Sequence, residues 1–439
     1  MKLETEQFKR FDLKSFSGLC IFLFVLFFSC KKEDTLDPVI VLEKPASQIT
    51  VGTSDTILVE AKITDNENIE KITVQLLSIN FVPVNSALIL QPGTSEFHLS
   101  VNYILQNAQL SSGTYLIGVT ASDGHNTAYA YREIYVLALP QVRKAIFVLS
   151  KSALGQIRIS KTDSLNQMQS FLSLLTDYSG SSISSRDQVL YVLGQTTGGL
   201  SFIDANTAAL LNSIPPNTPM GPPTFQYLHF NDNLNFISFY DGNVRAYDQF
   251  ANRQFEVVQS GFARPGVLLK TLDYVYVENY YPGSQQNRLE QYFYPSGVSN
   301  QILTLDLDIV EMCEKSADEI LLFGQKNGSA VLQEYNRLNN NVQTIRTFGA
   351  YEIKSVYQYR NTLYYLATSA GLYRYDLDQN SLTPLTTTAT QEVVYDALLN
   401  EYFVSENNLV RVFDGGNFSE KYTLTEPDSI LKVLFLYDR

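Results

Sequence analysis

A repeated strand unit is the feature that most constrains how this chain can fold. Its clearest copy spans residues 188–214, with the sequence QVLYVLGQTTGGLSFIDANTAALLNSI. The pattern indicates an apolar strand, a glycine turn, a strand that ends in an acid, a polar turn and a further apolar strand. Such a unit leaves an apolar face that only a neighbouring copy can cover, so further copies are expected in the same chain.

Six more copies align on the glycine or asparagine of the middle turn. The aligned positions are Gly155, Gly199, Gly242, Asn287, Gly328, Gly371 and Asn408, with spacings of 44, 43, 45, 41, 43 and 37 residues. The four-stranded blades of a β-propeller repeat at about 40–50 residues. Residues 141–439 are therefore predicted to form a seven-bladed β-propeller.

The C-terminal strand is predicted to close this ring. The first unit lacks an innermost strand on its N-terminal side, and the strand at residues 430–436 has no unit of its own. We expect that strand to complete the first blade, because closure removes unpaired strand edges. Other innermost strands are expected just upstream of their units, at residues 225–230, 266–270, 309–313, 353–359 and 392–399.

Residues 38–140 are predicted to form a separate β domain. They contain strands of alternating pattern at residues 57–63, 69–77, 97–103, 113–121 and 129–137. Several short strands within roughly a hundred residues are typical of an immunoglobulin-like β-sandwich. The segments VEAKITDNENIEKITVQL and GTYLIGVTASDGHNTA resemble PKD-like and cadherin-like domains of bacterial surface proteins. The chain as a whole is expected to be all-β.

Residues 1–29 are typical of an export signal. Four basic residues precede an apolar run at residues 19–28, which is shorter than the roughly 20 residues that a spanning helix needs. The pair Ser29-Cys30 resembles a bacterial lipobox, which implies cleavage before Cys30 and acylation of its thiol. The lysine and acids at residues 32–34 resemble the signal that sends Bacteroidota lipoproteins to the outer face of the outer membrane.

Charge and cysteine content exclude some partners and some modes of stabilisation. The formal net charge is −13, and it becomes −14 when the four basic and three acidic residues of segment 1–29 are removed. Nucleic acid is therefore not an expected partner, because its binding depends on Lys and Arg. After the tether at residues 30–37, the mature chain has Cys313 as its one further cysteine, so a disulfide framework is excluded.

The repeat carries a family resemblance of its own. Residues 190–214 resemble YVTN-type and NHL-type propeller repeats. Other copies keep a shorter pattern that ends in Asp248, Asp376 and Asp414, which we expect to bond backbone amides in the following turn. The chain also resembles Bacteroidota surface lipoproteins in which an Ig-like or PKD-like domain precedes a propeller.

Residues suited to catalysis or metal binding are sparse. Only His229 of the three histidines falls in the propeller segment, and it is expected to be buried, as is Cys313. Phosphate loops, nucleophile elbows and metalloprotease motifs are absent from the sequence, and no cofactor or metal is expected. Asp306 and Asp308 alternate along a strand and present either a paired-carboxylate site or a solvated strand end.

An acidic cluster in the first domain leaves two interpretations open. Asp65, Glu67 and Asp123 offer the hard oxygen ligands of a calcium site. The same residue types also bond the backbone of tight turns. The calcium motifs of cadherins are absent, which favours turns.

Two departures from the regular repeat are the candidate ligand sites. One is a lengthened loop with Tyr280, Tyr281, Gln285 and Gln286, followed by two more candidates, Tyr292 and Tyr294. The other is the proline-rich linker at residues 215–223. Aromatic rings cover the apolar faces of sugars and amides bond hydroxyls. The alternative is that the tyrosines face between blades.

These observations predict a lipid-anchored cell-surface protein that binds a glycan or a protein partner through propeller loops and has no catalytic activity. The expected location is the outer membrane, facing outward, with membrane lipid contacted through acylated Cys30. One alternative is an extracellular hydrolase or lyase that degrades polysaccharide or peptide on a propeller scaffold. Another is a structural subunit of an outer-membrane complex.

Overall fold

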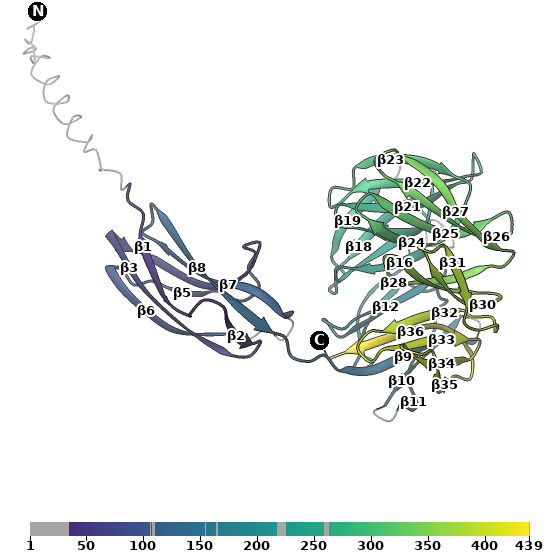
Figure 1. Cartoon of the computed structure of the whole chain (residues 1–439), viewed down its shortest axis with the longest axis horizontal. Coiled ribbons are helices and arrows are strands. Elements are labelled where there is room, and N and C mark those ends of the chain that lie inside the picture. The colour runs from purple at the N-terminus through teal and green to yellow at the C-terminus, as the bar shows by residue number, and fades with distance from the viewer. Residues whose placement is uncertain are drawn as a thin grey trace, which may run out of the picture. The chain divides into compact units, whose positions relative to one another are not determined.

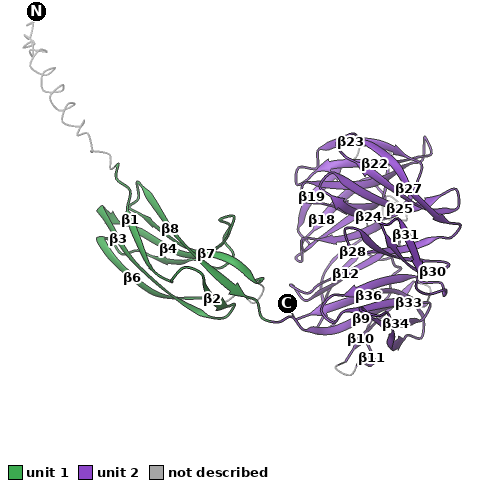
Figure 2. Cartoon of the chain, in the orientation of Figure 1, with its two compact units in different colours: residues 1–139 green, residues 140–439 purple. Residues whose placement is uncertain are grey.

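The computed structural model describes residues 35–438, apart from 106, 108–109, 154, 164–165, 217–224 and 259–262. In these residues every regular element is a β-strand, and they contain no helix long and apolar enough to cross a membrane. The prediction of an all-β chain is confirmed. The chain divides into two compact units, Met1–Leu139 and Pro140–Arg439 (Figure 2). The predicted signal peptide and Cys30 lie outside the described residues.

Unit 1 contains two sheets. The first has the order β1-β3-β6, with β1 (Val39–Lys44), β3 (Thr56–Ile69) and β6 (Thr94–Ile104). The second has the order β2-β8-β7-β4-β5, with β2 (Ile49–Gly52), β4 (Lys71–Ser78), β5 (Leu88–Leu90), β7 (Gly113–Ser122) and β8 (Thr127–Leu137). The five strands predicted for this segment correspond to β3, β4, β6, β7 and β8.

The core of unit 1 follows from alternation along its strands. In β3, Ile57, Val59, Ala61 and Ile63 are buried, whereas the residues between them are partly or fully exposed. Successive side chains of a strand point to opposite faces, so one face of β3 enters the core and the other meets water. Buried residues of the second sheet, such as Val119, belong to the same apolar cluster. The two sheets therefore share one core.

Unit 2 consists of four-stranded antiparallel sheets. One has the order β11-β10-β9-β36, with β9 (Arg143–Ala153), β10 (Gln156–Thr162), β11 (Met168–Leu174) and β36 (Ser429–Tyr437). The next three run in chain order: β12 (Gly180–Ser184), β13 (Val189–Leu193), β14 (Leu200–Asp204), β15 (Leu210–Ile214); β16 (Phe225–Asn231), β17 (Leu234–Phe239), β18 (Asn243–Tyr247), β19 (Arg253–Val258); β20 (Arg264–Lys270), β21 (Tyr274–Tyr281), β22 (Gln286–Phe293), β23 (Ser299–Leu305).

The remaining sheets keep the same order. Their strands are β24 (Asp308–Ser316), β25 (Glu319–Lys326), β26 (Ser329–Asn336), β27 (Asn341–Gly349); β28 (Ile353–Arg360), β29 (Leu363–Thr368), β30 (Gly371–Asp376), β31 (Ser381–Pro384); β32 (Glu392–Asp396), β33 (Glu401–Glu406), β34 (Leu409–Asp414), β35 (Glu420–Thr425). The predicted repetition of four-stranded sheets is confirmed.

The sheets of unit 2 meet through their first strands. Each first strand contacts the first strand of the next sheet, in the order β12, β16, β20, β24, β28, β32 and β36. β36 in turn contacts β12, so the series is cyclic. Fourth strands such as β11, β19 and β23 lie at the outside of the unit (Figure 1). Four-stranded sheets arranged in this way around an axis form a fold of the propeller type.

Aspartates at the ends of third strands stabilise the turns that follow. Asp248, Asp376 and Asp414 accept hydrogen bonds from backbone amides of those turns at distances of 2.8 to 3.2 Å. A short acidic side chain satisfies amides that a tight turn leaves without backbone partners. The structural role predicted for these aspartates is confirmed.

The C-terminal strand joins the sheet of β9, as predicted. β36 is antiparallel to β9, with a register that runs from Ser429 opposite Lys151 to Tyr437 opposite Arg143. Val433 of β36 is buried in the apolar cluster between this sheet and that of β33. β36 thus takes the first-strand position that β9, β10 and β11 cannot fill.

A buried group of charges reinforces the same junction. Arg143 Nη1 lies 2.6 Å from Asp396 Oδ2 and 2.9 Å from Glu401 Oε2, and all three side chains are less than a tenth exposed. The two acids belong to β32 and β33, so the cluster ties the first sheet to the last. Removal of Arg143 alone would leave the buried Asp396 carboxylate without a cation, at a cost of about 3–5 kcal/mol, whereas Glu401 would keep its ion pair with Lys421.

We expect deletion of residues 430–439 to abolish the cooperative unfolding of unit 2. The deletion removes β36 and leaves β9 and the neighbouring first strands uncovered. Thermal melts followed by circular dichroism test this expectation, with deletion of residues 438–439 as the matched control because it leaves β36 complete. An unchanged sharp transition in the longer deletion would contradict the assigned role of β36.

Candidate functional site

The turns between second and third strands lie at the same end of unit 2 as the links between successive sheets. In a four-stranded antiparallel sheet, this turn and the end of the fourth strand fall on one side. Short links, such as the two residues between β23 and β24, keep the next sheet in the same orientation. We term this side the link end. Loops gathered at one end of a rigid β scaffold are common locations for binding sites.

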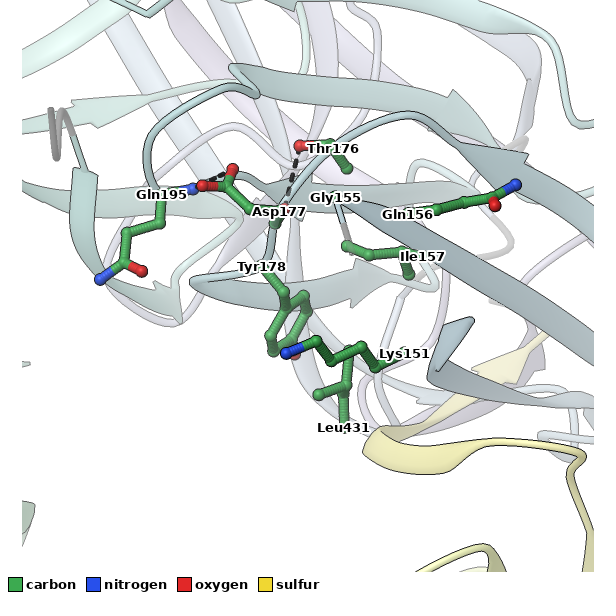
Figure 3. Close-up of a pocket in the computed structure, with 9 residues that line it drawn as sticks. All are labelled: Lys151, Gly155, Gln156, Ile157, Thr176, Asp177, Tyr178, Gln195 and Leu431. Atoms are coloured by element: carbon green, nitrogen blue, oxygen red, sulfur yellow. Dashed lines mark hydrogen bonds between the residues drawn. The ribbon is translucent and has the colours of Figure 1, made fainter. Parts of the chain in front are cut away.

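A pocket of about 270 Å³ lies at the link end, between the sheets of β9 and β13 (Figure 3). Its walls come from the β9–β10 turn, the β11–β12 link, the turn after β13 and the beginning of β36. The lining residues are Lys151, Gly155, Gln156, Ile157, Thr176, Asp177, Tyr178, Gln195 and Leu431. The strand that closes the sheet of β9 therefore also forms part of the pocket.

Asp177 fixes one wall of this pocket. Its carboxylate accepts hydrogen bonds from the backbone amides of Gln195 at 2.9 Å, Thr196 at 2.6 Å, and Thr197 and Gly198 at 3.2 Å. Burial by itself would raise the pKa of Asp177, but these hydrogen bonds outweigh it and hold the pKa below its ordinary value. Because the carboxylate already accepts hydrogen bonds from the loop, contacts with a ligand would come from the other residues that line the pocket.

Glycine makes this close approach possible. A Cβ on Gly198 would lie 1.6 Å from Thr176 Oγ1, and a Cβ on Gly194 would lie 2.5 Å from the Cα of Gly198. No side chain fits at such distances, because real Cβ contacts are longer. The glycines of the most regular repeat therefore also shape the pocket wall.

Tyr178 and Lys151 supply an aromatic ring and a cation. The Tyr178 hydroxyl lies 2.9 Å from Ser181 Oγ, and burial raises its pKa to about 12 although the charge of Lys432 opposes the change. Lys151 and Leu431 lie beside the ring (Figure 3). Within the described part of the chain, the structure shows no hydrogen bond or ion pair for Lys151 Nζ. This ammonium is available to a ligand.

First strands carry a further group of polar side chains, which we term the axial cluster: Tyr227, Glu311, Glu392 and Lys432. Tyr227 Oη donates a hydrogen bond of 3.4 Å to Glu311 Oε1 and so links β16 to β24, which belong to sheets that are not neighbours. Lys432 pairs with Glu392, whose other oxygen accepts the Val433 amide at 2.9 Å. The cluster therefore spans the axis of unit 2.

Burial sets the protonation behaviour of these acids. Burial raises the pKa of Glu311 to about 7, although the charge of Lys432 and the hydrogen bond from Tyr227 both act to lower it. On β21, burial likewise raises the pKa of Glu278 to about 7, although the Ile309 amide donates to its carboxylate at 2.9 Å. Two carboxyl groups of unit 2 thus titrate near neutral pH.

Four of the predicted ligand-binding residues come together at the tip of one hairpin. Tyr280 and Tyr281 end β21, Gln285 occupies the turn with a φ of +51°, and Gln286 begins β22 opposite Tyr281. The Tyr280 side chain is 38% exposed, and the Arg288 guanidinium stacks on the Tyr281 ring at 4.3 Å. This tip lies at the link end.

Tyr292 and Tyr294 do not share that tip. Tyr292 is buried and donates a hydrogen bond of 2.5 Å to Glu290. Tyr294 packs against Phe236 and Phe255, with ring centroids 6.1 and 5.5 Å apart. Both rings lie toward the far end of β22, in the inter-sheet position that the alternative interpretation gave them. Of the proline-rich linker, residues 217–223 lie outside the described residues.

Asp306 and Asp308 do not form a pair. Asp306 forms an ion pair with Lys326 and accepts a hydrogen bond of 3.0 Å from Gln333 Nε2, on the sheet that follows the link. Asp308 accepts one of 2.7 Å from Asn287 Nδ2, on the sheet that precedes it. The two carboxylates are engaged in opposite directions, so they do not present the two-acid arrangement that the alternation suggested.

Cys313 is buried, as the sequence indicated, whereas His229 is only partly buried. Burial lowers the pKa of His229 to about 4, and the charge of Lys270 adds to the effect. Cys313 is 5% exposed, and burial raises the pKa of its thiol. A buried, protonated thiol in this position is unsuited to nucleophilic chemistry.

The acidic residues of unit 1 follow the turn interpretation in part. Asp123 accepts the amides of His125 and Asn126, each at 2.6 Å. Asp65 and Glu67 belong to β3 rather than to the same turn. Among residues 35–438 with the gaps given above, no group of three or more His, Cys, Asp or Glu side chains is placed to hold a metal ion.

Sequence reasoning did not single out Lys151, Asp177 or Tyr178. Each belongs to an ordinary strand end or link, and no local motif marks them. The available signal was positional: a link between two repeats necessarily lies beside the second-to-third-strand turn of the next one.

Comparisons with known protein families and with curated proteins gave no match. Among solved structures, the chain is similar to the computationally designed Ika8 protein, with 12% identity and a TM-score of 0.46 over 67% of this chain and 91% of that one. A quinonprotein alcohol dehydrogenase-like protein from Bacteroides thetaiotaomicron gives 11% and 0.45, over 91% and 99%. Apo AztD from Citrobacter koseri gives 12% and 0.46, over 67% and 98%. These similarities identify no ligand and no reaction.

Glu311 and Glu278 are expected to make unit 2 less stable as the pH rises through neutrality. Each has a pKa of about 7 in the folded protein against an ordinary value of 4.5, so folding favours the protonated form. Their contribution is fully present below about pH 4.5 and is lost as the pH rises through about 7.

The Glu311→Gln and Glu278→Gln variants should therefore lose less stability than the wild type between about pH 5 and about pH 8 in denaturant melts. Glu43→Gln, on the exposed surface of unit 1, is the matched control. Equal losses in wild type and both variants would contradict the expectation.

Proposed function

We propose that this chain is a lipid-anchored protein of the outer cell surface that binds a ligand and has no catalytic activity of its own. In this proposal residues 1–29 are removed, Cys30 carries lipid in the outer membrane, and the folded units face outward. Unit 1 is an Ig/PKD-like β-sandwich, a proposal supported by its two sheets over one core. Unit 2 is a seven-bladed β-propeller, a proposal supported by the cyclic contacts of its first strands.

The pocket at the link end is the observation that carries the binding function. It combines the Tyr178 ring, the amide side chains of Gln156 and Gln195, and the unpaired Lys151 ammonium, with Asp177 holding one wall. Its volume of about 270 Å³ lies near the lower limit for small-molecule sites. A ring that covers an apolar face, beside amides that bond hydroxyls, suits one sugar unit of a glycan.

The hairpin tip and the two aspartates bear on the alternative sites and functions. The exposed hairpin tip at Tyr280 and Tyr281 lies at the link end and can extend the contact with a longer glycan or with a protein partner. A hydrolase or lyase gains no support from Asp306 and Asp308, whose partners lie on different sheets. A structural subunit of an outer-membrane complex would use the same exposed loops.

Acylation of Cys30 is expected to place the protein in the membrane fraction. Metabolic labelling with an alkyne fatty acid should mark the wild type, whereas Cys30→Ser should lose the label and leave the membrane fraction. Cys313→Ser is the matched control because that thiol is buried in unit 2. A label retained in Cys30→Ser would contradict the anchor.

Binding at the pocket is tested by screening the purified protein against arrays of soluble oligosaccharides and peptides. Lys151→Ala and Tyr178→Leu should each weaken a detected interaction at least about tenfold, which corresponds to about 1.4 kcal/mol. Tyr280→Ala separates the pocket from the hairpin tip. Binding that is lost in Tyr280→Ala but kept in both pocket variants would move the site to the hairpin, and no binding at all would contradict the proposed function.

A further inference from the structure

Unit 1 carries a row of exposed aromatic side chains on the outer face of its five-stranded sheet. In β8, Tyr129, Tyr131 and Tyr135 alternate with residues that face inward, and their side chains are 61%, 41% and 40% exposed. A tyrosine can bury roughly 150–250 Å² of surface when it is covered. The rings of Tyr129 and Tyr131 stack with centroids 6.4 Å apart, and exposed apolar surface of this kind on a folded domain points to an interaction site.

The turn after β4 adds another ring to this face. Phe81 has a φ of +62°, a left-handed conformation that is unfavourable for a bulky residue. Ser78 holds the turn, because its carbonyl accepts the Phe81 amide at 3.0 Å and its hydroxyl accepts the Val82 amide at 3.2 Å. The Phe81 ring meets Tyr131 edge-on at 5.1 Å and yet is 58% exposed. The strained backbone does not bury the Phe81 ring, so it does not contribute to the core. This points to a role for the ring other than folding.

A groove of about 310 Å³ lies between this turn and β8. The lining residues are Ile79, Phe81, Leu116, Tyr131 and Glu133. Opposite Tyr131 in β7 stands Gly118, where a Cβ would lie 3.3 Å from the tyrosine ring. The glycine therefore lets the ring lie close over the sheet and leaves the groove open.

We propose that this groove and the tyrosine row beside it bind a neutral saccharide. The rings of Phe81 and Tyr131 offer apolar faces for the C–H surface of a sugar. The Glu133 carboxylate and the tyrosine hydroxyls accept and donate hydrogen bonds to its hydroxyl groups. Strand β8 continues the face past Tyr129 and Tyr135, so a chain of several sugar units has rings to follow.

Size and charge favour a saccharide over other occupants. Five side chains line the groove, whereas a stable protein interface buries about 800 Å² on each partner. A purely apolar occupant, such as a lipid tail, would cover Glu133 and leave a carboxylate without a partner. The net charge of −13 opposes acidic polymers and anionic membranes.

This site is independent of the link-end pocket and goes beyond the proposed function, in which unit 1 has no ligand. The two proposals can fail separately because they rest on different residues in different units. A variant in one unit is therefore the natural control for the other.

Affinity electrophoresis of the full chain tests the inference. The gels contain one soluble neutral polysaccharide each: starch, xylan, mixed-linkage β-glucan, galactomannan or dextran. We expect at least one to retard the wild type, and Tyr131→Ala to reduce its affinity at least tenfold. Phe81→Gly should do the same, and because glycine accepts the positive φ this variant should keep its melting temperature. Phe250→Ala, an exposed ring in unit 2, should bind like the wild type.

Four results would overturn the inference. One is the absence of retardation by every neutral polysaccharide, and another is unchanged retardation of both Tyr131→Ala and Phe81→Gly. The third is retardation lost in Lys151→Ala but kept in Phe81→Gly, which assigns the binding to the link-end pocket. The fourth is binding of phosphatidylglycerol vesicles or of an acidic polysaccharide in place of the neutral ones.

Discussion

The pairing of β36 with β9 is the interaction on which unit 2 depends. Val142 and Asp438, which are hydrogen-bonded at this junction, are 296 residues apart in the sequence. Bringing residues so far apart in sequence together costs chain entropy, and the contacts between the two strands offset this cost only when the strands meet. Arg143 reinforces the contact, since its buried charge is satisfied by Asp396 and Glu401 only in the closed arrangement. Without closure, β9 would expose an unpaired strand edge, and the last sheet would expose the apolar face that β36 covers.

The candidate pocket also depends on the pairing of β36 with β9. Lys151 belongs to β9, Leu431 to β36, and Tyr178 to the link that leads into β12. Leu431 reaches the other two side chains only because the two ends of unit 2 have joined. Closure and ligand binding are therefore thermodynamically linked, and a ligand that occupies the pocket stabilises the closed unit by mass action.

The regular parts of the fold could be predicted because each depends on short-range patterns. Strand alternation located β3, β4, β6, β7 and β8, the turn chemistry of Asp248 follows from its own loop, and the unpaired last strand required a partner. Exposure within stacked sheets could not be predicted. In β22, four consecutive residues, Leu289 to Tyr292, are buried because both faces of the strand are covered. An alternating pattern of apolar and polar residues therefore could not predict that Tyr292 is buried. Asp177 was missed because the amides that it binds come from another repeat.

The distance in sequence between β9 and β36 also sets the order in which the parts of unit 2 become available. Chains grow from the N-terminus at about 5–20 residues per second, so residues 429–437 are made after every other described strand of unit 2. All strands of unit 1 precede them, whereas the sheet of β9 has no first strand until β36 has been made. Until then the edge of β9 stays unpaired, and a product truncated before β36 would remain in that state.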